Sequence, residues 1–195
     1  LIPGLISTIL MFYPSLLAAL IVVREKEVGT IYNLYCSPVK AWEVVVGKTV
    51  PYIVISFVAY LLIFLLSVLF FEVRFTGSFA ALTVSALLFL LCTVGYGLLI
   101  SIIASSQLAA MFITILTTML PSFFYSGFLS PVASQSALGQ FISILLPSTY
   151  FMYIVRGIYL KGASFAIIWP DLAALLLYSV ILYFLAIISF RKKVS

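Results

Sequence analysis

The side chains of this chain that could do chemistry gather in one polar segment, residues 24–40. Four charges stand in succession from Arg24 to Glu27, in a chain with 10 basic and 5 acidic residues. Apolar side chains follow at helical spacing and give a short helix one apolar face: Val28, Ile31, Tyr32 and Tyr35. Ser37-Pro38 ends that helix, because proline disfavours a helical residue before it and lacks a backbone donor. Such a helix either docks onto a soluble partner or lies on lipid.

Catalytic constellations are missing from the sequence. There is no histidine, which excludes a histidine-based triad and a zinc-protease helix. The acidic residues do not pair within an apolar run, which argues against a carboxylate proton relay: Glu25, Glu27, Glu43, Glu72 and Asp171. A glycine-rich phosphate loop with its lysine is also absent, so we expect no ATP hydrolysis by this chain. We predict no catalytic residue, no metal site and no cofactor bound by the chain itself.

Composition places the chain in a membrane. Hydrophobic residues make up 65% and charged residues 8%, with a mean hydropathy of +1.33, whereas soluble domains carry about 25% charged residues. The net charge of +5 does not indicate nucleic acid, because the basic residues stand at the edges of apolar runs. The lipid bilayer is therefore the first partner that the sequence predicts.

Five apolar runs reach the length of about 20 residues that a spanning helix needs: 1–23, 46–71, 79–104, 108–128 and 171–190. They are helices rather than barrel strands, because barrel strands are shorter and alternate strictly. We predict an all-α, polytopic helix bundle in one domain, residues 1–195.

Basic residues orient the bundle. With the Arg24–Lys48 segment inside, seven basic residues are cytoplasmic: Arg24, Lys26, Lys40, Lys48, Arg191, Lys192 and Lys193. Three lie outside: Arg74, Arg156 and Lys161. The positive-inside rule favours this topology, in the plasma membrane, or the inner membrane if the source is bacterial. The N-terminus is then outside, and we expect one further span to precede it.

Residues 129–170 differ from the rest, because this extracytoplasmic region contains three prolines. Within it, the apolar run 137–146 is too short to span a membrane and suits a re-entrant or interfacial helix. Pro170 is expected at or near the first position of the last helix, with Asp171 complementing its N-terminus.

Residues Thr93-Val-Gly-Tyr-Gly97 are identical in sequence to a potassium-channel selectivity filter, in which backbone carbonyls line a pore. The five residues lie inside one continuous apolar run, close to its cytoplasmic end. We therefore interpret them as helix, with Gly95 and Gly97 allowing close packing against neighbouring helices. An ion channel remains an alternative function.

The sequence of segment 24–40 resembles the cytoplasmic coupling loop of ABC-2 type transporter permeases: Arg-Glu-Lys-Glu-x-Gly-Thr, then Ser-Pro-Val. Further matches follow in the family's order and spacing: Gly47-Lys48 with Pro51, Gly95 to Ser101, Pro121 with Ser126 to Phe128 and Pro131, Leu146 to Tyr150, and Arg156 to Gly162. The resemblance covers nearly the whole chain and implies an ABC-2 transmembrane domain that lacks its N-terminal span.

The resemblance implies an exporter permease that moves a hydrophobic or amphipathic substrate outward. Its partners would be an ABC ATPase subunit, which uses ATP-Mg, and a second permease, identical or related. Residues expected to couple to the ATPase are Glu25, Lys26, Glu27, Gly29, Thr30, Asn33, Ser37 and Pro38. In the family the region 129–170 forms short re-entrant helices at the outer mouth.

Four residues near that mouth are candidates for a substrate exit region: Tyr125, Tyr150, Tyr153 and Arg156. Two plainer interpretations stay open, namely tyrosines at the headgroup level and an arginine that reaches up to the headgroups. A membrane anchor or assembly factor that transports nothing is the remaining alternative function.

Overall fold

The structure is a computed structural model that describes residues 2–29, 41–71 and 75–191. Four predicted coupling residues, and the short helix expected to carry them, lie outside these ranges: Thr30, Asn33, Ser37 and Pro38. The regular elements of the described part are all helices.

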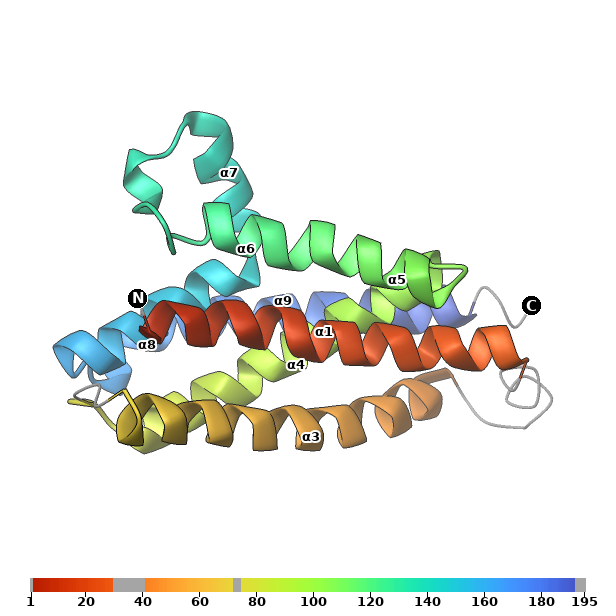
Figure 1. The fold of residues 1–195 in the computed structure, drawn as a ribbon, viewed down its shortest axis with the longest axis horizontal. Coiled ribbons are helices and arrows are strands. Elements are labelled where there is room, and N and C mark those ends of the chain that lie inside the picture. Colours follow the sequence, from red (N-terminus) through yellow and green to blue (C-terminus); the bar gives the residue numbers. More distant parts are fainter. Residues whose placement is uncertain (1, 30–40, 72–74, 192–195) are drawn as a thin grey trace.

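Among the described residues, five helical stretches are long and apolar enough to cross a membrane, which confirms the predicted all-α membrane bundle. They are α1 (Ile2–Val28), α3 (Ala41–Leu69), α4 (Phe79–Ile103), the unit α5 (Gln107–Thr114), η1 (Ile115–Met119) and α6 (Leu120–Tyr125), and α9 (Phe165–Arg191). Successive stretches run in opposite directions (Figure 1). The end of α1 and the starts of α3 and α5 therefore lie at one end of the molecule, which we call the inner end after the predicted topology.

Helix α4 is the centre of the bundle, and it packs most extensively against α1 and α9. The core continues into α8 (Pro147–Lys161), whose Phe151 ring stacks on Phe89 of α4 at 4.2 Å between centroids and 9° between planes. Tyr60 of α3 and Tyr159 of α8 are also buried in this core. The core thus joins α1, α3, α4, α8 and α9.

The filter-like residues Thr93–Gly97 form continuous α-helix inside α4. Gly97 faces α1, where an added Cβ would overlap the backbone oxygen of Ser15 and lie 2.8 Å from the Cβ of Ala18. Gly95 faces α9, where an added Cβ would lie 3.3 Å from the Tyr183 ring. Both glycines serve close helix packing, as predicted, and the segment does not have the geometry of a carbonyl-lined filter.

The fourth span contains a π-helical turn, Ile115–Met119, between α5 and α6. Thr114, Thr117 and Thr118 each donate a side-chain hydrogen bond to the carbonyl four residues earlier. Pro121 follows at the start of α6 and cannot donate to the helix ladder. Wide turns of this kind relieve a ladder that a proline interrupts.

The region 129–170 holds η2 (Val132–Ser134), α7 (Ala137–Leu145), α8 and the first residues of α9. Helix α7 matches the predicted short run and extends away from the bundle (Figure 1). The pair α7 and α8 bends by 86° at Leu146, which fits a re-entrant or broken span. Unlike α7, α8 is 15 residues long and mostly buried against α1, α4 and α9.

The predicted start of the last helix was wrong. Helix α9 begins at Phe165, so Pro170 and Asp171 lie inside it rather than at its first turn. The helix opens with a tight turn in which Ile167 N–H donates to the Ser164 carbonyl at 2.9 Å. Pro170 is the sixth residue of α9, just past the first four N–H groups that lack intrahelical partners, so it removes one helix hydrogen bond near the start.

Gly97 lies against backbone and Gly95 against a side-chain ring, and this difference gives a prediction about stability. Gly97→Ala should lower the thermal midpoint of the purified full-length permease strongly, since overpacking against backbone costs about 1–3 kcal/mol. Gly95→Ala is the matched control and should have the smaller effect, because only the edge of the Tyr183 ring must move. Equal midpoints for the two variants, measured in the same detergent, would contradict the close α1–α4 packing.

Candidate functional site

Helix α1 continues past the predicted boundary at residue 23 and includes the charged residues Arg24 to Glu27. It ends where Gly29 adopts a left-handed conformation with φ of 81° and donates to the Lys26 carbonyl at 3.2 Å. Glycine takes this conformation without strain, so it closes helices well. The four charges therefore belong to the last turns of a spanning helix. The sequence predicts that this span ends at residue 23, whereas the helix continues to Val28.

Glu25 joins α1 to α3. Its carboxylate forms a salt bridge with the ammonium group of Lys48, which lies two turns into α3. The Lys48 side chain is only 13% exposed and that of Glu25 is 37% exposed. A partly buried pair of this kind is screened less than a surface pair, so it favours one placement of α3 beside α1.

Lys26 joins α1 to the end of α4. Its ammonium donates to the carbonyls of Ser101, Ile102 (3.4 Å) and Ala104 (3.5 Å). These carbonyls belong to the last turn of α4, where helix acceptors lack intrahelical partners and carry partial negative charge. A lysine there satisfies the helix end and complements its dipole.

Glu27 joins α1 to the start of α5. One carboxylate oxygen accepts from the backbone N–H of Gln107 at 2.8 Å, and the other accepts from its side-chain amide. Gln107 is the first residue of α5, and the N-cap Ser106 accepts from Ala109 N–H at 3.2 Å. An acidic group at a helix N-terminus is favoured by the free donors and by the dipole.

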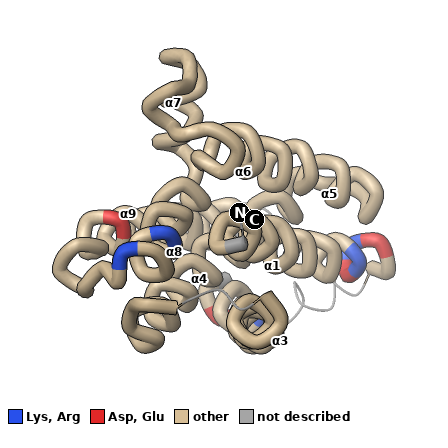
Figure 2. Tube along the Cα trace, turned by 60° about the vertical axis from the view of Figure 1, so that its left-hand side comes forward, with Lys and Arg blue, Asp and Glu red and all other residues tan. Residues whose placement is uncertain are grey.

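Three successive side chains of α1 thus contact three different helices. We call this group the inner polar cluster: Glu25, Lys26, Glu27, Lys48 and Gln107. Figure 2 shows charged residues at the end of α1, at α3, and in a second set around α8 and α9. The roles of Lys48, predicted only as a cytoplasmic cation, and of Gln107 could not be predicted from the sequence, because partners 23 and 80 residues away leave no local pattern.

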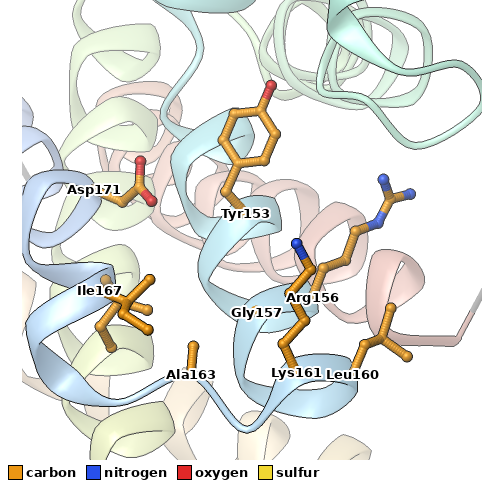
Figure 3. Close-up of a pocket in the computed structure, with 9 residues that line it drawn as sticks. Tyr153, Arg156, Gly157, Leu160, Lys161, Ala163, Ile167 and Asp171 are labelled. Carbon is orange, nitrogen blue, oxygen red and sulfur yellow. The ribbon is translucent and has the colours of Figure 1, made fainter.

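The predicted exit residues do not form one group. Tyr153 and Arg156 line a pocket of about 420 Å³ between α8 and α9, the α8–α9 pocket, together with Lys161 and Asp171 (Figure 3). Tyr150 lies elsewhere, because its hydroxyl donates to the Ile144 carbonyl at 3.0 Å. Tyr125, the last residue of α6, does not line the pocket.

The fold and the polar cluster define a multi-pass helical membrane protein whose charged contacts tie helix ends together. Residues 1–188 match the model of the ABC-2 family transporter proteins. The chain belongs to the ABC-2 transporter family, as the resemblance of segment 24–40 implied.

Two relatives of this chain are proteins of Escherichia coli. The chain is 32% identical over 193 residues to the probable multidrug ABC transporter permease YbhR of strain K12, covering 99% of this chain and 52% of that protein. It is 38% identical over 102 residues to the probable multidrug ABC transporter permease YbhS of the same strain, covering 52% of this chain and 27% of that protein. The chain spans about half the length of YbhR.

The Lys26 contacts give a local prediction. Lys26→Met should speed amide exchange at the end of α4 about two- to fivefold, because a cation at a helix C-terminus contributes about 0.3–1 kcal/mol. Arg24→Met is the matched control, since it removes one cation from an exposed side chain of the same helix turn. Hydrogen exchange followed by mass spectrometry on the full-length permease measures both. The same exchange in both variants would show that Lys26 does not hold the α4 terminus.

Proposed function

We propose that the chain is the transmembrane permease portion of an ABC exporter that moves a hydrophobic or amphipathic substrate outward. Family membership and the multidrug names of YbhR and YbhS support this proposal. The energy would come from a separate ATPase subunit that binds ATP-Mg, since the sequence lacks a phosphate-binding loop with its lysine. A second permease, identical or related, would complete the pathway.

The observation that carries the mechanism is the inner polar cluster. The segment 30–40, which we propose as the ATPase-docking element, follows directly on Gly29. A displacement of that segment reaches α1 through Gly29 and α3 through Ala41. Because Glu25, Lys26 and Glu27 contact α3, α4 and α5, the displacement passes to the inner ends of four helices together.

This mechanism divides the predicted coupling residues into two roles. Glu25, Lys26 and Glu27 are engaged within the chain, so we propose that they transmit the movement rather than dock the ATPase. Gly29 connects α1 to segment 30–40, and its left-handed backbone sets the direction in which the chain leaves α1. The docking role is proposed for Thr30, Asn33, Ser37 and Pro38.

The alternative functions have less support. The helical conformation of Thr93–Gly97 offers no carbonyl-lined pore for a channel. An anchor or assembly factor would bind an ATPase without substrate-dependent turnover, so measured turnover separates it from an exporter.

Co-purification tests the ATPase partner. The full-length permease, extracted from native membranes in detergent, should retain an ABC ATPase subunit. The double variant Gly29→Pro with Glu27→Lys should lose it, because proline cannot adopt the positive φ at position 29. Arg24→Gln serves as the control and should retain the ATPase. Absence of any ATPase from the wild-type sample would contradict the exporter.

Coupling has a separate test. Reversal of both acids, Glu25→Lys with Glu27→Lys, should lower the dye-stimulated ATPase rate of the reconstituted complex about tenfold or more while leaving the helical content unchanged. The physical reason is that each reversal places two cations, or a cation and a helix N-terminus, side by side. Circular dichroism checks the fold, and an amphipathic dye serves as the transport probe. An unchanged stimulated rate would remove the cluster from the coupling route.

A further inference from the structure

The fourth span is held at its two ends by different helices. At the inner end, the Gln107 N–H donates to the Glu27 carboxylate of α1 at 2.8 Å. At the outer end, the hydroxyl of Ser122 in α6 donates to the hydroxyl of Ser148 in α8 at 3.0 Å. The Ser148 carbonyl also accepts from Ser7, near the outer end of α1, at 3.1 Å. A displacement of the inner end that leaves the outer contacts in place must therefore bend the span.

Between these contacts the span contains a turn that is wider than an α-helical one. The Leu120 N–H donates to the Ile115 carbonyl, five residues earlier rather than four. A turn closed in this way holds one more residue than an α-helical turn does. Single π turns inside α-helices are rare and are frequent at functional sites.

The spacing of small residues explains why the extra residue is needed. Every fourth residue along the span is small and buried: Ala110, Thr114, Thr118, Ser122 and Ser126. In a regular α-helix each step of four residues turns about 40° past a full circle, so four steps would carry this row about 160° around the helix. The extra residue takes back about 100° of that rotation. The row can then stay on the side of the span that faces the bundle.

Hydroxyl groups make the wide turn compatible with a membrane. A widened or bent ladder leaves backbone carbonyls that lipid cannot satisfy. Thr114, Thr117 and Thr118 donate to the carbonyls four residues before them at 2.6–2.7 Å, and bonds of this kind bend helices. Pro121 has no N–H, so no backbone bond from this residue has to break when the span bends. Bending here costs fewer hydrogen bonds than bending a regular stretch of helix.

The turn is packed on one side only. The share of the apolar window that is buried is 22% in the fourth span, against 61% in α1 and in α4. Leu116, Met119 and Leu120 are exposed. The packed side lies along α1, as Figure 1 shows for α5 and α6. Within the described part of the chain, the turn thus contacts the helix that would be displaced and is otherwise free to bend.

We propose that the π turn Ile115–Met119 is a hinge in the export cycle. Helix α5 follows the inner end of α1 through Gln107 and Glu27, α6 stays with α8 through Ser122 and Ser148, and the wide turn bends between them. This inference rests on the proposed function, because it assigns the bending to a displacement of α1 by the ATPase. It goes further by locating the point at which the fourth span yields.

A variant without the extra residue tests the hinge. Deletion of Thr117 together with Pro121→Ala gives the full-length permease an uninterrupted α-helix in which the small residues keep their facing. This variant should keep its thermal midpoint and co-purify with the ATPase subunit. The dye-stimulated ATPase rate of its reconstituted complex should fall to the unstimulated rate. Pro121→Ala alone is the matched control, since it keeps the extra residue and should keep the stimulation.

A second deletion tests whether the turn really holds the extra residue. Met111 lies in the regular helix α5, so its deletion turns Gln107 about 100° away from Glu27. The Met111 deletion should therefore lower the thermal midpoint, whereas the Thr117 deletion should not.

Amide exchange of the unmodified permease–ATPase complex measures the hinge without any substitution. Helix α3 is the matched reference, because the buried share of its apolar window is also 22%. Residues 115–120 should exchange about fivefold faster than residues 54–58 of α3, as expected where a backbone hydrogen bond is weakened. Addition of ATP and dye should raise the exchange of residues 115–120 further and leave residues 54–58 unchanged.

The outcomes separate the hinge from the export function. A Thr117 deletion variant with a normal midpoint and full dye stimulation would overturn the hinge and leave the exporter unaffected. A wild-type sample without any ATPase would instead contradict the exporter. If the deletion variant does not fold, the exchange measurement decides. Equal exchange in the two segments, or no rise with ATP and dye, would then overturn the hinge.

Discussion

Every helix ends with backbone N–H or C=O groups that have no intrahelical partner, and these groups need partners from side chains, water or lipid headgroups. This constraint organises the inner end of the molecule. The last carbonyls of α4 and the first N–H of α5 are both satisfied by side chains of α1, through Lys26 and Glu27. Because one helix provides both partners, the tight turn between α4 and α5 cannot shift without α1.

Packing of α4 against α1 and α8 restrains the helices that meet at the inner end. Gly97 brings α4 against the backbone of α1, and the Ser15 hydroxyl donates to the Thr93 carbonyl at 2.9 Å across the same contact. The stacked pair Phe89 and Phe151 extends the core to α8. A push on α1 therefore moves packed helices rather than one flexible segment. The π-helical turn in the fourth span is the exception, since its ladder is wider than that of the neighbouring helices.

Hydropathy predicted the spanning helices well. The runs 46–71 and 79–104 correspond to α3 (Ala41–Leu69) and α4 (Phe79–Ile103), because apolar length is a local property of the sequence. The packing role of Gly95 and Gly97 was also predictable, since small residues inside a span favour close approach. The short helix α7 followed from an apolar run too brief to span.

Other features depend on contacts between residues far apart in the sequence, so no local sequence pattern predicts them. Polar residues after an apolar run look like the start of a loop, so the charges of α1 were placed beyond its end. Their partners Lys48, Gln107 and the α4 carbonyls come from other helices. A proline followed by an acid predicts a helix start at Pro170, whereas α9 accommodates this proline one turn in. Similarly, only the packing of α8 against α9 brings Arg156, Lys161 and Asp171 into one pocket.

The proposed coupling role of Glu25 depends on its bond to Lys48 rather than on a contact with another subunit. The direct measurement is the ATPase rate of the reconstituted permease–ATPase complex with the two charges exchanged, Glu25→Lys with Lys48→Glu. Each single reversal should lower the dye-stimulated rate, and the exchanged pair should recover most of it because the salt bridge between α1 and α3 is restored with opposite polarity. A double variant as inactive as Glu25→Lys alone would contradict the account and assign Glu25 to the partner's surface.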